Sequence, residues 1–119
     1  MPAIPNVLLK QLYVKGSLRN SAGGWAFDLS NYLGAGTITA FERLAVDGRD
    51  VPTDQVEIET SDGNRRPASG TSPTRPLSLP ANVRVAVHVA GAPLPPGKHR
   101  LDVCFQAQEL GELAFHVTD

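Results

Sequence analysis

The sequence predicts an all-β protein, an antiparallel β-sandwich of jelly-roll-like form with about eight short strands. Short runs in which apolar and polar residues alternate recur along the chain, as in strands with one buried face. The 11 glycines and 10 prolines fall mostly between these runs. No segment keeps the 3.6-residue period of an amphipathic helix. With 119 residues, the chain is expected to form one domain, 1–119.

The expected strands follow one another with turn signals between them. In chain order they cover about 7–15, 25–30, 37–39, 44–46, 56–58, 83–89, 99–107 and 113–118. An extension of the first strand through Ser17 and Leu18 fits the same pattern. Residues 41–44 are expected to form one helical turn at most. Asp47-Gly48 is a dipeptide typical of a two-residue hairpin turn.

The two longest alternating runs are separated by Pro95-Pro96-Gly97. Val83 to Val89 places four valines on one face, and His99 to Ala107 places histidine, leucine, valine, phenylalanine and alanine on one face. Proline fixes φ and glycine accepts positive φ, so the residues between the two runs are typical of a turn. The sequence therefore predicts an antiparallel pair formed by these two runs and joined by a Gly/Pro loop.

One segment, 61–81, lacks the alternation typical of a strand. Its sequence is SDGNRRPASGTSPTRPLSLPA, with four prolines, two glycines and three arginines. We expect a long irregular loop, which is either mobile or functional, covering a pocket or gripping a partner. Arg65, Arg66 and Arg75 are interpreted either as an anion-binding group or as ordinary solubilising charges.

Composition excludes several classes of function. The net charge is −1, so neither nucleic acid nor an anionic membrane is an expected partner. No apolar run approaches the roughly 20 residues of a membrane helix, and MPAIPNVLLK lacks the pattern of a secretory signal. There is one cysteine, Cys104, so an internal disulfide is impossible. We expect a cytoplasmic protein.

No catalytic, metal-ligating or cofactor-binding motif stands out. His88 and His116 are expected to point outward and His99 toward the core, without the spacing of a metal site. Cys104 is interpreted as a small buried apolar group within a strand. No pair of carboxylates has a spacing typical of general acid–base catalysis. We therefore predict no catalytic residue, no metal and no cofactor.

A second interpretation stays open. In it, His88, His116 and the arginines of 61–81 form the site of a small stand-alone enzyme or a ligand-binding barrel. Such a site requires His88 and His116 to converge in one concave pocket. Trp25 and Tyr32 border turns and are either interface anchors or core residues. The candidate binding or interface residues are Trp25, Tyr32, Arg65, Arg66, Arg75, His88 and His116.

Three stretches carry a family resemblance by their order and spacing. They are VKGSLRNSAGGWAFDLSNYL (14–33), LAVDGRDVP (44–52) and PLPPGKHRLDVCF (93–105). Together they resemble the small β subunit of bacterial C-glycoside deglycosidases, over about two-thirds of the chain. Where members of that family are expected to carry an LPYYRG-like stretch, this chain has LSNYLGAG, of which Tyr32 and Gly34 match.

The resemblance implies a β-sandwich that pairs with a larger, metal-dependent α/β-barrel subunit of a lyase-type complex. In that family the barrel subunit carries the catalytic residues, so the resemblance assigns no catalytic residue to this chain. The resulting expectation is a non-catalytic accessory or interaction subunit, whose partner is either that larger enzyme subunit or further copies of the chain in a jelly-roll homo-oligomer with a binding role.

Overall fold

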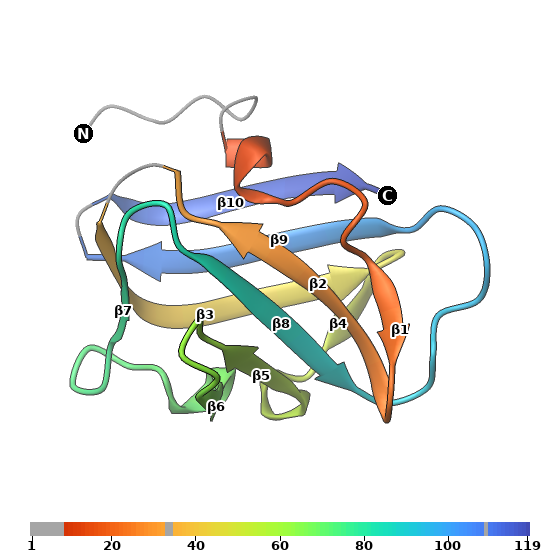
Figure 1. The fold of residues 1–119 in the computed structure, drawn as a ribbon, viewed down its shortest axis with the longest axis horizontal. Coiled ribbons are helices and arrows are strands. Elements are labelled where there is room, and N and C mark those ends of the chain that lie inside the picture. Colours follow the sequence, from red (N-terminus) through yellow and green to blue (C-terminus); the bar gives the residue numbers. More distant parts are fainter. Residues whose placement is uncertain (1–8, 33–34, 109) are drawn as a thin grey trace.

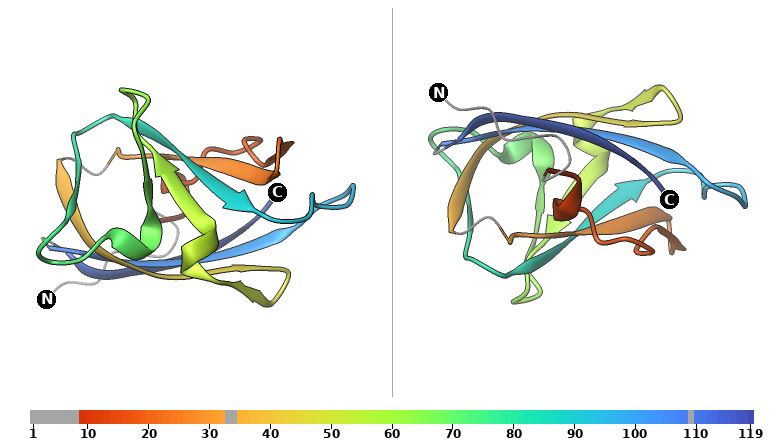
Figure 2. Two further views of the ribbon diagram at one scale, coloured as in Figure 1. Left: turned by 90° about the horizontal axis from the view of Figure 1, so that it is seen from below. Right: turned by 90° about the horizontal axis from the view of Figure 1, so that it is seen from above.

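The chain folds into two antiparallel β-sheets packed face to face (Figures 1 and 2). The structure is a computed structural model, and it describes residues 9–32, 35–108 and 110–119. Ten strands and three short 3₁₀ helices are present in these ranges. The predicted all-β sandwich is confirmed. None of the helices in the described part of the chain is long and apolar enough to cross a membrane.

Each sheet has five strands. Sheet A has the order β1 (Arg19–Ser21), β2 (Gly24–Ser30), β8 (Arg84–Ala90), β5 (Val56–Glu59) and β6 (Arg65–Pro67). Sheet B has the order β10 (Gly111–Thr118), β9 (Arg100–Ala107), β3 (Gly36–Val46) and β4 (Arg49–Val51), with β7 (Leu77–Leu79) paired to the start of β3. All these pairings are antiparallel, as in a sandwich of hairpins and crossovers.

The core lies between the inward faces of the two sheets. Alternate residues of β8 and β9 are buried, which is the period-2 signal on which the prediction rested. Phe27 from sheet A and Leu44 and Leu101 from sheet B are fully inaccessible to solvent. Burying such side chains stabilises the fold by about 1.5–3 kcal/mol each.

The sides of the sandwich are closed by 3₁₀ turns. η1 (Lys10–Leu12) lies against β2 and β10, whereas η2 (Thr53–Gln55) and η3 (Ala68–Gly70) lie near β3 on the other side. Leu9, Leu12 and Tyr13 are buried. This segment was predicted as a strand over 7–15, but Tyr13 makes only a single bridge to Leu29. Apolar residues three apart share one side of a 3₁₀ turn, which explains the difference; residues 7 and 8 lie outside the described residues.

Strand β3 is one long strand where two short strands and a helical turn were expected. Its pairing with β9 shifts register twice, between Ile38 and Ala40 and between Phe41 and Arg43. Each shift is a β-bulge that adds one residue to β3. As a result Ile38, Phe41 and Leu44, spaced by three, all face the core. The bulges broke the period-2 pattern and gave residues 41–44 a helix-like spacing.

The two longest alternating runs are not paired with each other. β8 lies in sheet A between β2 and β5, and β9 lies in sheet B between β10 and β3. Residues 91–99 therefore cross from one sheet to the other, and the predicted hairpin is wrong. A connection stiffened by Pro93, Pro95 and Pro96 is too long and extended for a tight turn. By contrast, the predicted Asp47-Gly48 hairpin is present between β3 and β4, with φ of 52° and 82° at these residues.

The segment 61–81 holds more structure than its expected irregular loop. It contains β6, η3 and β7, and Ala68, Thr71 and Leu77 within it are buried. Arg66 ties the segment together, since its guanidinium donates to the carbonyl oxygens of Arg75 at 3.0 Å and Pro76 at 3.2 Å. A few apolar anchors and one arginine thus fold a stretch rich in proline and glycine back onto the sandwich.

Candidate functional site

The two predicted aromatic anchors belong to the inside of the molecule. Trp25 is 4% exposed, and its ring stacks on Phe27 with 6.0 Å between ring centroids. Tyr32 is partly buried against the core, and burial raises the pKa of its hydroxyl. Of the two interpretations left open for Trp25, the structure matches core burial.

The two outward histidines lie on opposite sides of the molecule. His88 is on the outer face of sheet A, where its Nε2 atom lies 2.7 Å from Oε1 of Glu59. His116 is on the outer face of sheet B, opposite Asp102 in the register with β9. The core of the sandwich separates them, so they do not converge in one pocket. The arrangement does not supply the geometry that the stand-alone enzyme requires.

The three arginines are used in three different ways. Arg65 lies 3.6 Å from the Glu59 carboxylate, at the edge of sheet A. Arg66 is held by backbone carbonyls of its own segment. Arg75 is exposed, and its backbone N–H donates to Oγ of Ser72. Arg66 and Arg75 border one shallow depression beside Pro76, whereas Arg65 belongs to the Glu59–His88 group.

His99 forms a polar junction at one end of the sandwich. Its Nδ1 atom is 2.6 Å from Oδ2 of Asp47, and its Nε2 atom is 2.7 Å from the Pro95 carbonyl oxygen. Both neighbours are acceptors, so the two contacts favour the form of the ring in which both nitrogens carry protons. The Asp47 carboxylate, and then the Pro95 carbonyl, raise the pKa of His99. His99 thus joins the 91–99 crossover to the β3–β4 turn.

Asp28 is the centre of a second polar group, on sheet A. It is buried, yet its carboxylate is paired on both sides, with Arg19 at 3.2 Å and with Arg84 at 2.7 Å. Its backbone N–H donates to Oγ of Ser17 at 3.0 Å. A buried carboxylate needs such partners. The group connects β1, β2 and β8, and Arg19 also borders a shallow depression beside Pro95 and His99.

A third group forms around Asp119. The hydroxyl of Tyr13 donates to Oδ2 of Asp119 at 2.5 Å, and the backbone N–H of Gly16 donates to the same atom at 2.9 Å. Burial and the Asp119 carboxylate raise the pKa of Tyr13, and the Tyr13 hydroxyl lowers the pKa of Asp119. The contact fastens the segment after η1 to the end of β10. The alternation of apolar and polar residues along a strand did not predict the groups around His99, Asp28 and Asp119. Their members come from different segments of the chain, and alternation within one strand does not connect them.

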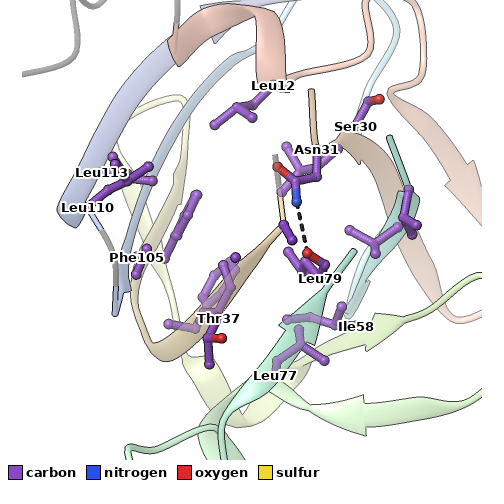
Figure 3. Close-up of a pocket in the computed structure, with 18 of the residues that line it drawn as sticks. Leu12, Ser30, Asn31, Thr37, Ile58, Leu77, Leu79, Phe105, Leu110 and Leu113 are labelled. Carbon is purple, nitrogen blue, oxygen red and sulfur yellow. Dashed lines mark hydrogen bonds between the residues drawn. The ribbon is translucent and has the colours of Figure 1, made fainter. Parts of the chain in front are cut away.

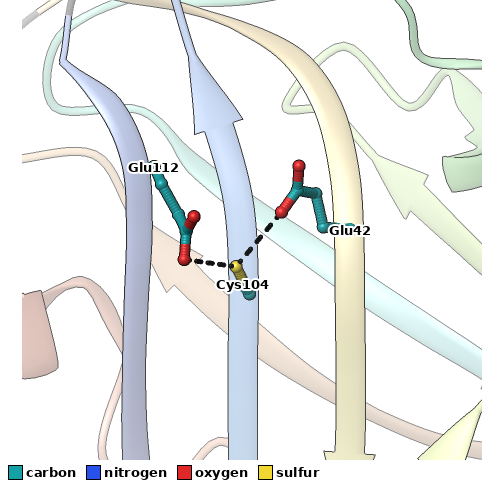
Figure 4. A group of neighbouring side chains, drawn as sticks. All are labelled: Glu42, Cys104 and Glu112. Atoms are coloured by element: carbon teal, nitrogen blue, oxygen red, sulfur yellow. Dashed lines mark hydrogen bonds between the residues drawn. The ribbon is translucent and has the colours of Figure 1, made fainter.

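Cys104 lies between two carboxylates on the outer face of sheet B (Figure 4). Its Sγ atom is 3.6 Å from Oε2 of Glu42 and 3.6 Å from Oε1 of Glu112. Burial, and then the charge of Glu112, raise the pKa of the thiol to about 11. The three groups are the one trio of potential metal ligands found among the described residues. A protonated thiol hydrogen-bonded to carboxylates accounts for the arrangement without an ion.

An apolar cavity lies between the two sheets of the described structure (Figure 3). Its volume is about 260 Å³. Both sheets contribute to its wall, for example Leu29 and Ile58 from sheet A and Phe105 and Leu113 from sheet B. No residue of the sequence-predicted site lies in this wall. The alternation signal that marks core strands does not distinguish a filled core from one with a cavity.

Two comparisons with known proteins bear on identity. A family model described as "Hydroxymethylglutaryl-CoA reductase, N-terminal domain" matches residues 8–119. Among curated proteins, none matches the chain. The matched range contains every strand and 3₁₀ helix of the sandwich.

This match corrects the resemblance drawn from the sequence. The chain was expected to resemble the small subunit of C-glycoside deglycosidases, and the family match overturns that expectation. The stretches that suggested it are mostly turns, such as Asp47-Gly48 and Pro95-Pro96-Gly97, which many β-sandwiches use. The match points to a non-catalytic domain of an enzyme. Whether the chain works with a larger subunit or with copies of itself stays a prediction.

Proposed function

Because the chain belongs to the family of the N-terminal domain of hydroxymethylglutaryl-CoA reductase, we propose that it is a non-catalytic accessory domain that binds the catalytic unit of such a reductase. The observation that carries this proposal is the extent of the match, which runs over the whole sandwich and not over a short motif. A folded unit of this kind contributes binding surface and rigidity to an enzyme.

The use of the polar side chains supports the same proposal. His99 binds Asp47 and Pro95, and Asp28 binds two arginines. His99 and Asp28 thus connect strands and loops, and they do so through the charged or hydrogen-bonding atoms of their side chains. Side chains engaged in this way hold a scaffold rigid, whereas catalytic groups face a substrate.

The exposed arginines of the predicted interface set are the proposed contact residues. Arg65 and Arg75 lie on exposed segments, whereas His88 and His116 are half-buried and lie on opposite faces of the sandwich. Charged and polar groups at the rim of an interface steer association more than they stabilise the complex. We expect charge reversal at Arg65 or Arg75 to slow association with the partner. A cytoplasmic location, consistent with the unpaired Cys104, is part of the proposal.

The test compares the chain, the catalytic unit of a hydroxymethylglutaryl-CoA reductase from the same source, and their mixture. The chain alone is expected to show no turnover of hydroxymethylglutaryl-CoA, and binding to the catalytic unit is expected to be saturable by calorimetry. The variant R75E should lower the association rate several-fold, and the matched control D54K, on the exposed η2 turn, should not. Turnover by the isolated chain, or saturated mixtures without any heat of binding, would contradict the proposal.

A further inference from the structure

The cavity between the sheets has the features of a ligand site, and we propose that it binds one neutral aliphatic chain. This inference goes beyond the accessory role, because it concerns a small molecule held inside the sandwich. It does not depend on the catalytic unit and can be tested on the chain alone.

The size suits a small ligand and not a large one. The cavity measures about 260 Å³. A cavity of about 150 Å³ lined by leucine, isoleucine and phenylalanine stays dry and binds benzene, and drug-sized ligands occupy about 300–1,000 Å³. The space is therefore sufficient for a ligand larger than benzene but smaller than a typical drug. A single short alkyl chain meets this condition.

The wall is apolar and carries no charge among the described residues. Its sides are formed by Leu12, Ile58, Leu77, Phe105 and Leu113, among other apolar residues from both sheets (Figure 3). No lysine, arginine, histidine, aspartate or glutamate of the described chain lines it. An ionised head group inside it would be desolvated without a counter-charge, which is costly. The wall therefore selects an uncharged aliphatic ligand.

Three polar residues interrupt the apolar wall. Ser30 and Asn31 lie where β2 ends, and Thr37 lies near the start of β3. The side chain of Asn31 donates to the Leu79 carbonyl oxygen at 3.0 Å and so holds β7 against the cavity. An apolar wall with a few polar groups fits a chain that ends in a hydroxyl, ester or amide.

The cavity reaches the surface. Leu110, in its wall, is 39% exposed and is the one large apolar side chain recorded as exposed among the described residues. Leu29, Leu79 and Val83 in the wall are only partly buried. Elsewhere the core is closed, as at Leu44 and Leu101, which are 0% exposed. A ligand thus has a route past Leu110, and the fold need not open to admit it.

The first experiment uses octanol as the probe, with octanoate and octylamine as charged probes of the same chain length. Calorimetry on the wild-type chain is expected to show saturable binding of octanol with one site, and binding of the two charged probes at least tenfold weaker. Octanol should also raise the unfolding temperature in proportion to its occupancy. Equal binding of all three probes, or no binding of octanol, would overturn the proposal.

Filling the cavity from inside provides the matched variants. A107L adds volume at a wall position of β9, whereas the control A114L adds the same volume at an exposed position of β10. A107L is expected to weaken octanol binding at least tenfold without lowering the unfolding temperature, and A114L should leave binding unchanged. If A107L lowers the unfolding temperature while octanol fails to bind, the space is closed and the proposal is wrong.

A second variant keeps the test valid if A107L does not fold. Ala35 lies in the wall at the exposed end of the cavity, so A35F can narrow the entrance without crowding the interior. The expected result is slower association of octanol in stopped-flow measurements, with the unfolding temperature unchanged. Octanol association at the wild-type rate in A35F would contradict entry at this end.

Discussion

The imidazole of His99 and the carboxylate of Asp47 are joined by a hydrogen bond of 2.6 Å between Nδ1 and Oδ2. The same ring donates through Nε2 to the Pro95 carbonyl oxygen. The backbone N–H of Arg100 donates to the other oxygen of Asp47 at 3.0 Å. One ion pair thus fixes the crossover between the sheets, the β3–β4 turn and the start of β9 relative to one another.

This junction makes the stability of the chain depend on pH in the alkaline direction. The pKa of His99 is raised above its ordinary 6.5 by Asp47 and Pro95. Its contribution is therefore complete below pH 6.5 and is lost as pH rises through the raised pKa. We expect the urea midpoint to fall over that range, and to fall much less in H99Q. Urea titrations of both chains from about pH 5 to about pH 9 check this.

The ionisation of Asp47 makes the stability of the chain depend on pH in the acidic range as well. Its pKa is lowered from 3.8 by the hydrogen bonds from His99 and from the Arg100 N–H. Its contribution is present above pH 3.8 and is lost as pH falls through the lowered pKa. D47N removes the charge, so the alkaline loss of stability should move to lower pH. An unchanged alkaline limb in D47N would contradict the assignment of His99 to this pair.

The two arginines beside Asp28 are expected to make this buried carboxylate costly to remove. D28A leaves both arginines without their partner, and hydrogen bonds between charged groups contribute about 1.5–3 kcal/mol. We predict a loss of about 2 kcal/mol in the free energy of unfolding. The matched control is D50A, because the Arg43–Asp50 pair is exposed. It should cost less than about 1 kcal/mol. Equal costs in urea denaturation would show that burial of Asp28 does not matter.

The bulges of β3 predict an unusual pattern of alanine effects. Ile38, Phe41 and Leu44 should each be costly to truncate, by about 2–5 kcal/mol, because all three face the core. Thr39 and Arg43, which lie between them, should each cost less than about 0.5 kcal/mol. A regular strand would instead place Phe41 and Leu44 on opposite faces. A low cost at either of these two residues in chemical denaturation would argue against the bulges.

Two adjacent glycines at the β1–β2 turn should respond differently to alanine. A Cβ atom at Gly24 would lie 1.8 Å from the Val89 carbonyl oxygen, and backbone cannot move aside easily. G24A is therefore expected to cost about 3 kcal/mol or more, at the upper end of overpacking effects. Gly23 has a φ of +82° and open space around it. G23A should cost only about 1–2 kcal/mol, the strain of a left-handed backbone. Differential scanning calorimetry ranks the two variants.

Cys104 should be unreactive for a thiol at the protein surface. With a pKa of about 11, about one thiol in a thousand is ionised at pH 8, compared with about one in ten for an ordinary pKa of 9.0. We expect alkylation by iodoacetamide to be about a hundredfold slower than in the urea-unfolded chain. The double variant E42Q/E112Q removes the negative charges and should react faster. Mass spectrometry of the native chain that shows alkylation at the unfolded rate would contradict the raised pKa.

The strands that follow simple alternation were predictable from sequence. In β8 and β9, valine, leucine and phenylalanine alternate with polar residues, and both strands formed where expected. The bulges of β3 were not predictable, since a residue added to a strand changes its period. Which sheet each strand joins was not predictable either, because the pattern marks a buried face without naming the partner strand. The wrong hairpin between β8 and β9 has this origin.

The functional residues were harder to predict for a related reason. His99 was placed on the core side, but its partner Asp47 lies 52 positions away in sequence, and nothing in the alternation connects them. Asp28 alternates with Phe27 and Leu29 in the sequence, but this alternation does not identify the two arginines that pair with it. The cavity arises from how residues of both sheets fail to fill the space between them, which is a property of packing in three dimensions.

The solution mass of the chain with the reductase catalytic unit tests the accessory role most directly. Light scattering on a sizing column should give a mixed species whose mass is the sum of the two components, with the 12.7 kDa chain bound in a fixed ratio. We expect R65E/R75E to reduce the amount of this species and D54K to leave it unchanged. A closed homo-oligomer of the chain that never binds the catalytic unit, at any ratio of the two, would contradict it.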